Sequence, residues 1–300
     1  MAYRHIIIRN PAKLSVRNNQ LIIKQENSVQ IPLEDICTLT IEDPAITLTG
    51  VLLSQCAAHN VELIVCDQKR IPSATLQPFH QHSRQKAVLD MQIGLSKPFK
   101  KRIWQKVVQA KIENQARCLE LTYQSEEADV LYTLSKQVES GDRTNKEAYA
   151  AKYYFNKLFG DQFTRRRDDP QNIALNYGYS LIRSLVARAL VRYGFMPSLG
   201  IFHDSQTNAF NLADDFMEPL RPFVDYTVAT YVKGDTVWDS EIKEKLFRIL
   251  SYSAYWKGEK QSITNGVDWM VKSYVAACRN GDPKFIVLPE LKSLELHVYE

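Results

Sequence analysis

The first quarter of the chain alternates hydrophobic and polar residues with the two-residue period of β-strands. Residues 13–17 and 21–25 flank Asn18-Asn19, a pair that tolerates positive φ, and this arrangement predicts a β-hairpin. Further strands are predicted over 6–8, 29–31, 36–41 and 61–66. One helix is predicted among them, over 50–59. The pattern predicts a small N-terminal β-sandwich-like domain with one helix, residues 1–76.

From residue 83 onward, hydrophobic residues recur with the period of a helix. A long helix is predicted from 103 to 121. Further helices are predicted over 128–138, 146–159, 173–193, 213–232, 242–256 and 266–278. Residues 71–78 carry two prolines and small polar side chains, so we expect the connection there and place the linker at 77–82. The expected fold class is α+β, with a larger all-α domain over 83–300.

Composition places the chain among ordinary globular proteins. It has 300 residues, 45% of them hydrophobic and 24% charged, which excludes disorder as the main state. No apolar stretch approaches the roughly 18 residues of a spanning helix. The first ten residues hold an apolar run of only three, too short for the core of a signal peptide. We therefore expect a cytoplasmic protein without a membrane partner.

Positive charge is concentrated in three places. Six cations and no acid lie between Lys97 and Lys111, and a second cluster is Arg165-Arg166-Arg167. A third series lies in one helical stretch and comprises Arg183, Arg188 and Arg192. Any one of these could be an ordinary solvated face. Together they resemble the footprint of a protein that binds a phosphate backbone.

Glu147 is the first candidate for chemistry. Thr144 and Glu147 are spaced as a helix capping box, and this gives Glu147 a purely structural interpretation. Its neighbours one turn along the helix are Ala150 and Ala151, which offer no ion pair. A carboxylate left free in this way could instead hold a metal cation.

A second group of candidates lies between 203 and 221. His203 stands in a loop between two predicted helices, where an imidazole is either a surface group or a metal ligand. Asp214, Asp215 and Glu218 share one helix face, where like charges repel unless a metal or Arg221 neutralises them. Asn211 could cap this helix, which would place Asp214 in its first turn, so capping could account for one aspartate. Mixed nitrogen and oxygen ligands suit Mg²⁺ or Mn²⁺, and the histidine favours Mn²⁺.

At these residues the sequence resembles a known family, the CRISPR adaptation integrase and endonuclease, which inserts new spacers. It is most like the type II form, subtype II-C. The resemblance covers essentially the whole chain and is carried by three motifs in order, residues 145–151, 199–203 and 211–222. The family's metal-binding residues fall on Glu147, His203 and Glu218. Many relatives have aspartate at the third position, so the resemblance leaves open what Asp214 and Asp215 contribute.

The resemblance implies a function as well as a fold. It implies a homodimer joined through the β-domains, and two such dimers bridged by a small second CRISPR adaptation protein. It also implies transesterification, in which the 3′-hydroxyl of protospacer DNA attacks a phosphodiester at the CRISPR repeat, assisted by Mg²⁺ or Mn²⁺. Arg165, Arg166 and Arg167 are our own prediction for phosphate contacts, and the run from Lys97 to Lys111 is a second.

Two other functions are compatible with the residues themselves. The first is a non-catalytic DNA-binding scaffold in which the acids only cap helices. The second is a metal-dependent phosphoesterase acting on small substrates, which the basic clusters disfavour. Strand-joining activity separates the integrase from the scaffold, and a salt-dependent affinity for DNA separates both from the small-substrate enzyme.

Overall fold

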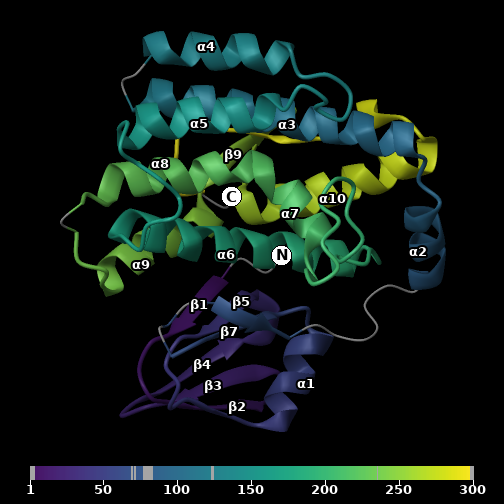
Figure 1. The fold of residues 1–300 in the computed structure, drawn as a ribbon. Helices are drawn as coiled ribbons and strands as arrows, with labels where there is room; N and C mark the ends of the chain where they lie inside the picture. The colour runs from purple at the N-terminus through teal and green to yellow at the C-terminus, as the bar shows by residue number, and fades with distance from the viewer. Residues whose placement is uncertain are drawn as a thin grey trace. The chain divides into compact units, whose positions relative to one another are not determined.

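The computed structural model describes residues 4–68, 70, 72–76, 84–122, 125–234 and 236–297. The chain divides into two compact units, residues 1–81 and 82–300 (Figure 1). The expected linker, 77–82, lies outside the described residues. No helix in the described ranges combines the length and the apolar character that crossing a membrane requires.

The first unit is built from two four-stranded sheets and one helix, α1 (Gly50–Ala58). One sheet has the order β1 (Arg4–Ile8), β5 (Ile36–Ile41), β7 (Glu62–Cys66), β8 (Pro72–Thr75). The other has the order β4 (Ser28–Pro32), β3 (Gln20–Lys24), β2 (Lys13–Arg17), β6 (Thr47–Leu48). The predicted hairpin is confirmed, since β2 and β3 pair antiparallel around Asn18 and Asn19, whose φ angles are 52° and 56°.

Both sheets contribute to one hydrophobic core, as a sandwich-like domain requires. Leu14 and Leu21 from one sheet and Leu39 and Leu63 from the other are buried in the same cluster, with Leu52 of α1. One part of the sequence prediction is wrong here. The stretch 71–78, expected to be a connection, contains β8, which pairs antiparallel with β7. A strand that begins with proline is tolerated because β8 lies at the edge of its sheet.

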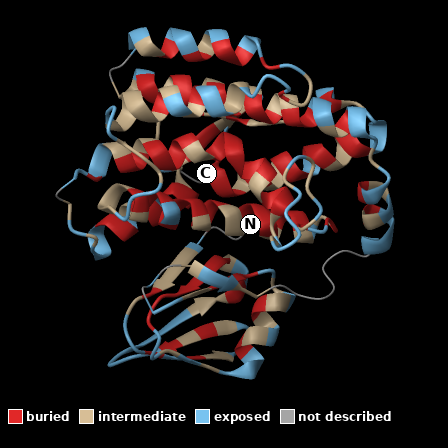
Figure 2. Cartoon of the chain, in the orientation of Figure 1, coloured by how far each residue is buried: buried red, intermediate tan, exposed pale blue. Residues whose placement is uncertain are grey.

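The second unit is mainly helical, as expected (Figures 1 and 2). Its helices are α2 (Gln85–Ile93), α3 (Lys97–Leu121), α4 (Ser125–Lys136), α5 (Lys146–Phe159), α6 (Pro170–Arg192), α7 (Asn211–Met217), α8 (Arg221–Tyr231), α9 (Ser240–Phe247) and α10 (Ile263–Asn280). Helix α3 packs against α4, α5 and α8. The predicted helix 213–232 is interrupted by a short 3₁₀ turn, η2 (Glu218–Leu220), because Pro219 removes a backbone donor.

The expectation of an all-α second domain needs a correction. The unit also holds a three-stranded antiparallel sheet with the order β10 (Glu259–Ser262), β9 (Ser253–Trp256), β11 (Pro289–Glu290). The helix predicted over 242–256 therefore ends early. Lys257 and Gly258 have positive φ angles of 53° and 86° and form the two-residue turn between β9 and β10.

Asn114, buried in the middle of α3, ties the site region to this sheet. Its side-chain nitrogen donates to the carbonyl of Pro219 at 2.8 Å and to that of Pro289 at 2.9 Å. Its oxygen accepts from the backbone nitrogen of Leu291 at 3.0 Å. Because every polar atom of this amide meets a backbone partner, η2 is held at a fixed place along α3.

Candidate functional site

Glu147 stands in the first turn of α5, and a different residue caps that helix. The predicted capping box is wrong, because Asp142 accepts from the backbone nitrogens of Lys146 at 2.8 Å and Glu147 at 3.0 Å. The carboxylate of Glu147 is also not free, since it forms an ion pair with Lys111 of α3. The sequence showed only that α5 itself offers Glu147 no ion-pair partner. The partner comes from the neighbouring helix α3.

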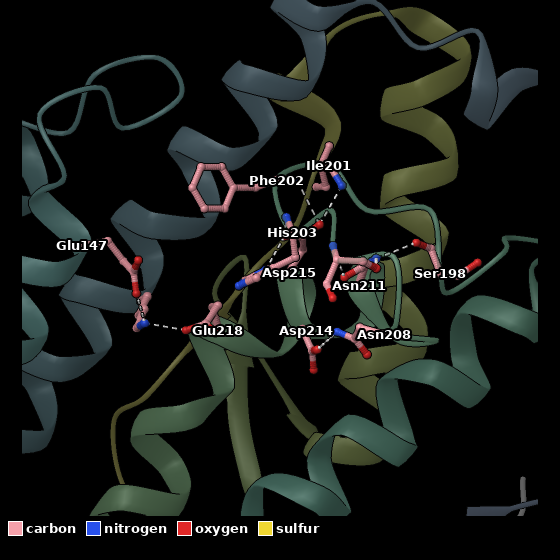
Figure 3. A network of polar contacts seen from close by, with 12 residues as sticks. Glu147, Ser198, Ile201, Phe202, His203, Asn208, Asn211, Asp214, Asp215 and Glu218 are labelled. Carbon is pink, nitrogen blue, oxygen red and sulfur yellow. Dashed lines mark hydrogen bonds and ion pairs between the residues drawn. The ribbon is translucent and has the colours of Figure 1, made fainter. Parts of the chain in front are cut away.

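Lys111 joins the two glutamates that the sequence singled out. Its ammonium contacts Glu147 Oε1 and Glu218 Oε2, and its side chain is 8% exposed. Figure 3 shows Glu147 and Glu218 approaching each other with these contacts between them. Burial alone would lower the pKa of Lys111, but the two carboxylates outweigh it and raise that pKa. Lys111 is therefore buried and ion-paired. Its place in the basic run had suggested a surface cation that contacts DNA, and the structure does not support this.

Glu218 is the most enclosed of the predicted ligands. It begins η2, is 4% exposed, and accepts from Arg221 Nε at 2.9 Å through Oε1. Burial would raise its pKa, yet the charges of Arg221 and Lys111 lower the pKa of Glu218 to about 2. Of the neutralising cations that the sequence left open, Arg221 pairs with Glu218, while Asp214 and Asp215 have other partners. The carboxylate of Glu218 is thus kept ionised in a buried place, as a metal ligand must be.

His203 lies on the loop between α6 and α7, and Asp215 of α7 holds it in place. Asp215 is fully buried and accepts from the backbone nitrogens of Ile201 at 2.6 Å, Phe202 at 3.2 Å and His203 at 3.0 Å. It also lies 2.8 Å from His203 Nδ1. A carboxylate can only accept, so Nδ1 carries the proton and Nε2 is left as the possible ligand. The hydrogen bond to Asp215 raises the pKa of His203.

The backbone of this loop requires a glycine at position 200. A Cβ there would lie 2.1 Å from the carbonyl oxygen of His203 and 2.9 Å from Asp215 Oδ2. Beyond the loop, the rings of Trp104 and Phe202 stack with centroids 4.2 Å apart, and His203 meets both edge-on at 5.7 Å. The imidazole is therefore fixed by packing as well as by its hydrogen bond.

Asp214 and Asn211 serve the same loop. Asp214 lies in the first turn of α7, as predicted, and accepts from Asn208 at 2.7 Å. Asn211 does not cap the helix; its side-chain nitrogen donates to the carbonyls of Ser198 at 3.0 Å and Ser205 at 2.9 Å (Figure 3). The loop that carries His203 is thus tied to α7 at both ends.

The three predicted ligands are brought together only in part. Within the described ranges, no three His, Cys, Asp or Glu side chains are close enough together to hold one metal ion. Glu147 and Glu218 meet at Lys111, while His203 lies near enough to Glu218 for each charge to shift the other's pKa. Glu218 Oε2 is buried, and its partner is the Lys111 ammonium. Two carboxylates and one imidazole fit Mg²⁺ or Mn²⁺ in chemistry, and a cation already lies between the carboxylates.

A cavity of about 220 Å³ opens beside the two glutamates, and Lys111, Arg165 and Arg221 also line it. An adjoining cavity of about 250 Å³ shares Arg165 and Arg221 and adds Arg183. Of the predicted arginine cluster, Arg165 therefore reaches the site, whereas Arg166 and Arg167 are exposed. Three guanidinium groups line these two cavities and favour an anionic ligand there.

Asp225, on α8, lines the first cavity, and the sequence did not single it out. It accepts from the hydroxyl groups of Tyr179 and, at 3.1 Å, Tyr154. Burial raises its pKa to about 6, and the hydrogen bonds and nearby arginines offset this only in part. No local pattern marks this aspartate, because its partners come from α5 and α6.

Comparisons with known proteins show which family the chain resembles in sequence and in fold. The family model for CRISPR associated protein Cas1 matches residues 6–250. A CRISPR-associated endonuclease Cas1 from Neisseria meningitidis serogroup C (strain 8013) is 41% identical over 304 residues, covering 100% of both chains.

Solved structures share the fold at low identity. A casposase bound to its integration product has a TM-score of 0.74 at 19% identity, covering 92% of this chain and 91% of that one. A Cas6-RT-Cas1–Cas2 complex has a TM-score of 0.72 at 18% identity, covering 98% of this chain and 37% of that one. The β-rich domain followed by a helical domain is thus the architecture of these neighbours, and the family match extends through all three motifs. The chain belongs to the Cas1 family of CRISPR-associated proteins.

Proposed function

We propose that this protein is a metal-dependent DNA endonuclease and integrase of CRISPR spacer acquisition in the cytoplasm. In this function it joins the 3′-hydroxyl ends of protospacer DNA to the CRISPR repeat by transesterification. One observation carries the proposal. Glu147 and Glu218, from elements far apart in the sequence, converge on a single buried cationic group.

The proposed metal ligands are Glu147, Glu218 and Nε2 of His203, and the ion is Mg²⁺ or Mn²⁺. Such an ion, when bound, polarises a phosphoryl oxygen and stabilises the charge that develops there. The chain's own groups prepare the site. Asp215 keeps the proton of His203 on Nδ1, and Arg221 holds Glu218 by its other oxygen. Transesterification exchanges one phosphodiester for another, so it needs no nucleotide cofactor.

The arginines beside the site support a DNA substrate. Arg165 donates to Asn172 at 2.5 Å and to Asn176 at 2.7 Å, and it lies 5.3 Å from the centre of the Tyr179 ring, so two neutral partners and a ring surround its charge. Arg183 lies over the ring of Phe210. We propose that these side chains contact phosphates of the DNA strand. The proposed assembly is a homodimer bridged by a Cas2 partner, and the Cas1–Cas2 complex among the structural neighbours supports that partner.

A strand-joining assay tests the proposed function. A 3′-hydroxyl oligonucleotide and a repeat-containing plasmid are incubated with the protein, the small partner protein and Mn²⁺. We expect joining by the wild-type protein, none after Glu147→Gln or His203→Ala, and retained DNA binding in both variants. Glu139→Gln is the matched control, because Glu139 is an exposed carboxylate paired only with the nearby Arg143 in the described part of the chain.

The same assay decides between enzyme and scaffold. If wild-type protein binds DNA but joins no strands under any divalent ion, the scaffold interpretation holds. If Glu147→Gln and His203→Ala join strands as well as Glu139→Gln does, the proposed ligand set is wrong. If DNA affinity is unchanged between low and moderate salt, the protein does not bind a phosphate backbone.

A further inference from the structure

Lys111 occupies the position between the two glutamates that we propose as metal ligands. It lies within the long helix α3, and its ammonium contacts one oxygen of each carboxylate. Its side chain is 8% exposed and that of Glu218 is 6% exposed. An ammonium so enclosed is costly unless opposite charges surround it, and here two carboxylates do.

The two carboxylates depend on this cation. In the described part of the chain, Lys111 is the one side-chain cation paired with Glu147. Arg221 pairs with Glu218 through Oε1 and leaves Oε2 to Lys111. Without Lys111, two negative groups would face each other across a buried space, and their repulsion would open the site. The lysine therefore keeps the ligands assembled when no metal is bound.

On Glu218, where Arg221 holds Oε1, a divalent ion would need Oε2, the oxygen that Lys111 contacts. Carboxylate oxygens bind Mg²⁺ at about 2.0–2.1 Å, so the ammonium cannot keep its contact with Glu218 Oε2 once an ion binds there. The cavity of about 220 Å³ that Lys111 itself lines offers space for the displaced side chain. Two cations of different charge thus compete for one pair of carboxylates.

We propose that Lys111 is a resident counter-cation that the metal ion displaces, so that this exchange sets the metal affinity of the site. The inference rests on the proposed metal-dependent function. In this role Lys111 is a positioning residue, which holds Glu147 and Glu218 in place for the incoming ion and weakens the binding of that ion.

Calorimetric titration of the full-length protein with Mn²⁺ alone tests the exchange. Lys111→Met keeps the length of the side chain and removes its charge. We expect it to bind Mn²⁺ about tenfold more tightly or better than wild type, because one positive charge that competes for the two carboxylates is gone. Lys111→Arg retains a cation and should bind no more tightly than wild type. Lys106→Met, on the same helix but outside the carboxylate pair, should leave the affinity unchanged.

The thermal midpoint gives a second readout. Lys111→Met should melt at a lower temperature than wild type without metal, and Mn²⁺ should raise its midpoint more than it raises that of wild type. Unchanged or weaker Mn²⁺ affinity in Lys111→Met overturns the proposal. The absence of Mn²⁺ binding in both wild type and Lys111→Met overturns it as well, because no exchange then takes place.

A measurement on wild type decides the matter if Lys111→Met does not fold. With ¹⁵N-labelled lysine, the Lys111 ammonium should give a protected signal that is absent from Lys111→Arg. Titration with Mg²⁺ should remove or shift this signal, and a signal that stays unchanged at saturation contradicts the displacement. Failure of the proposed function would appear differently, as Mn²⁺ exchange without any strand joining by wild type.

Discussion

Two buried carboxylates three residues apart, Asp215 and Glu218, are held in different ways. Asp215 is fully buried, and three backbone N–H groups and the ring of His203 surround it. Glu218 instead contacts two side-chain cations, Arg221 through Oε1 and Lys111 through Oε2. Backbone donors cannot leave, whereas a lysine side chain can. The comparison indicates that Asp215 builds the His203 loop and that Glu218 is available to a ligand.

Replacing Glu218 should have the largest effect. Glu218→Gln keeps the volume of the side chain and removes the charge, so we expect strand joining to fall by about 10³-fold or more, as for loss of a group that stabilises transition-state charge. The measurement is the rate of Mn²⁺-dependent joining, with Glu139→Gln as control. A loss smaller than that of Asp215→Asn would reverse the roles assigned to these two carboxylates.

A third buried carboxylate, Asp225, extends the comparison, because its protonation makes the stability of the protein depend on pH. Burial raises the pKa of Asp225 from 3.8 to about 6, so the folded state holds its proton more tightly than the unfolded state. Its contribution to stability is therefore fully present below 3.8 and is lost as the pH rises through about 6. The free energy of unfolding that is lost in this way amounts to about 3 kcal/mol.

Asp225→Asn should remove this dependence, because the amide does not titrate. Relative to wild type, its free energy of unfolding should increase between about pH 4 and about pH 7 by up to that amount. Urea denaturation at a series of pH values provides the measurement. A difference between the two proteins that does not vary with pH would show that Asp225 has an ordinary pKa in the folded state.

Asp215→Asn should act through His203. We expect strand joining to decrease by about 10- to 100-fold, as for other residues that orient a metal-binding histidine. In the same variant the pKa of His203 should fall, because its raised pKa comes first from the hydrogen bond to Asp215. NMR titration of the imidazole gives this readout. A reduced activity with an unchanged His203 pKa would mean that Asp215 acts only on folding.

The arginines should show the smallest and most selective effect. Arg165 lines both cavities, while Arg166 is exposed beside it, so the pair forms a matched comparison. Arg165→Gln should reduce the slope of log affinity for DNA against log salt by about 1, the value for one phosphate contact. Arg166→Gln should change the slope less. Equal changes in both would place the phosphate contact outside the cavities.

The sequence predicted the site as far as local pattern and family resemblance reach. Glu147, His203 and Glu218 come from three motifs, and Glu147 and Glu218 do meet. Lys111 could not be predicted, because a lysine on an amphipathic helix normally faces water and only the packing of α3 against α5 and η2 buries this one.

The fold shows the same limit. Asn18 and Asn19 revealed a hairpin because positive φ angles are a local requirement. The small sheet around β9 was missed, since the hydrophobic spacing over 242–256 also fits a helix and the partner strand β11 lies far along the chain. Local chemistry therefore predicted the hairpin at Asn18 and Asn19, whereas the hairpin at Lys257 and Gly258 was missed because the residues before it also fit a helix.

The central claim is that Glu147, His203 and Glu218 hold one divalent ion. Anomalous diffraction from crystals soaked in Mn²⁺ tests it most directly. We predict one manganese ion bound to a carboxylate oxygen of Glu147, a carboxylate oxygen of Glu218 and Nε2 of His203. A protein that joins strands in Mn²⁺ but shows no manganese at these three side chains, or binds it at Asp214 instead, would contradict the claim.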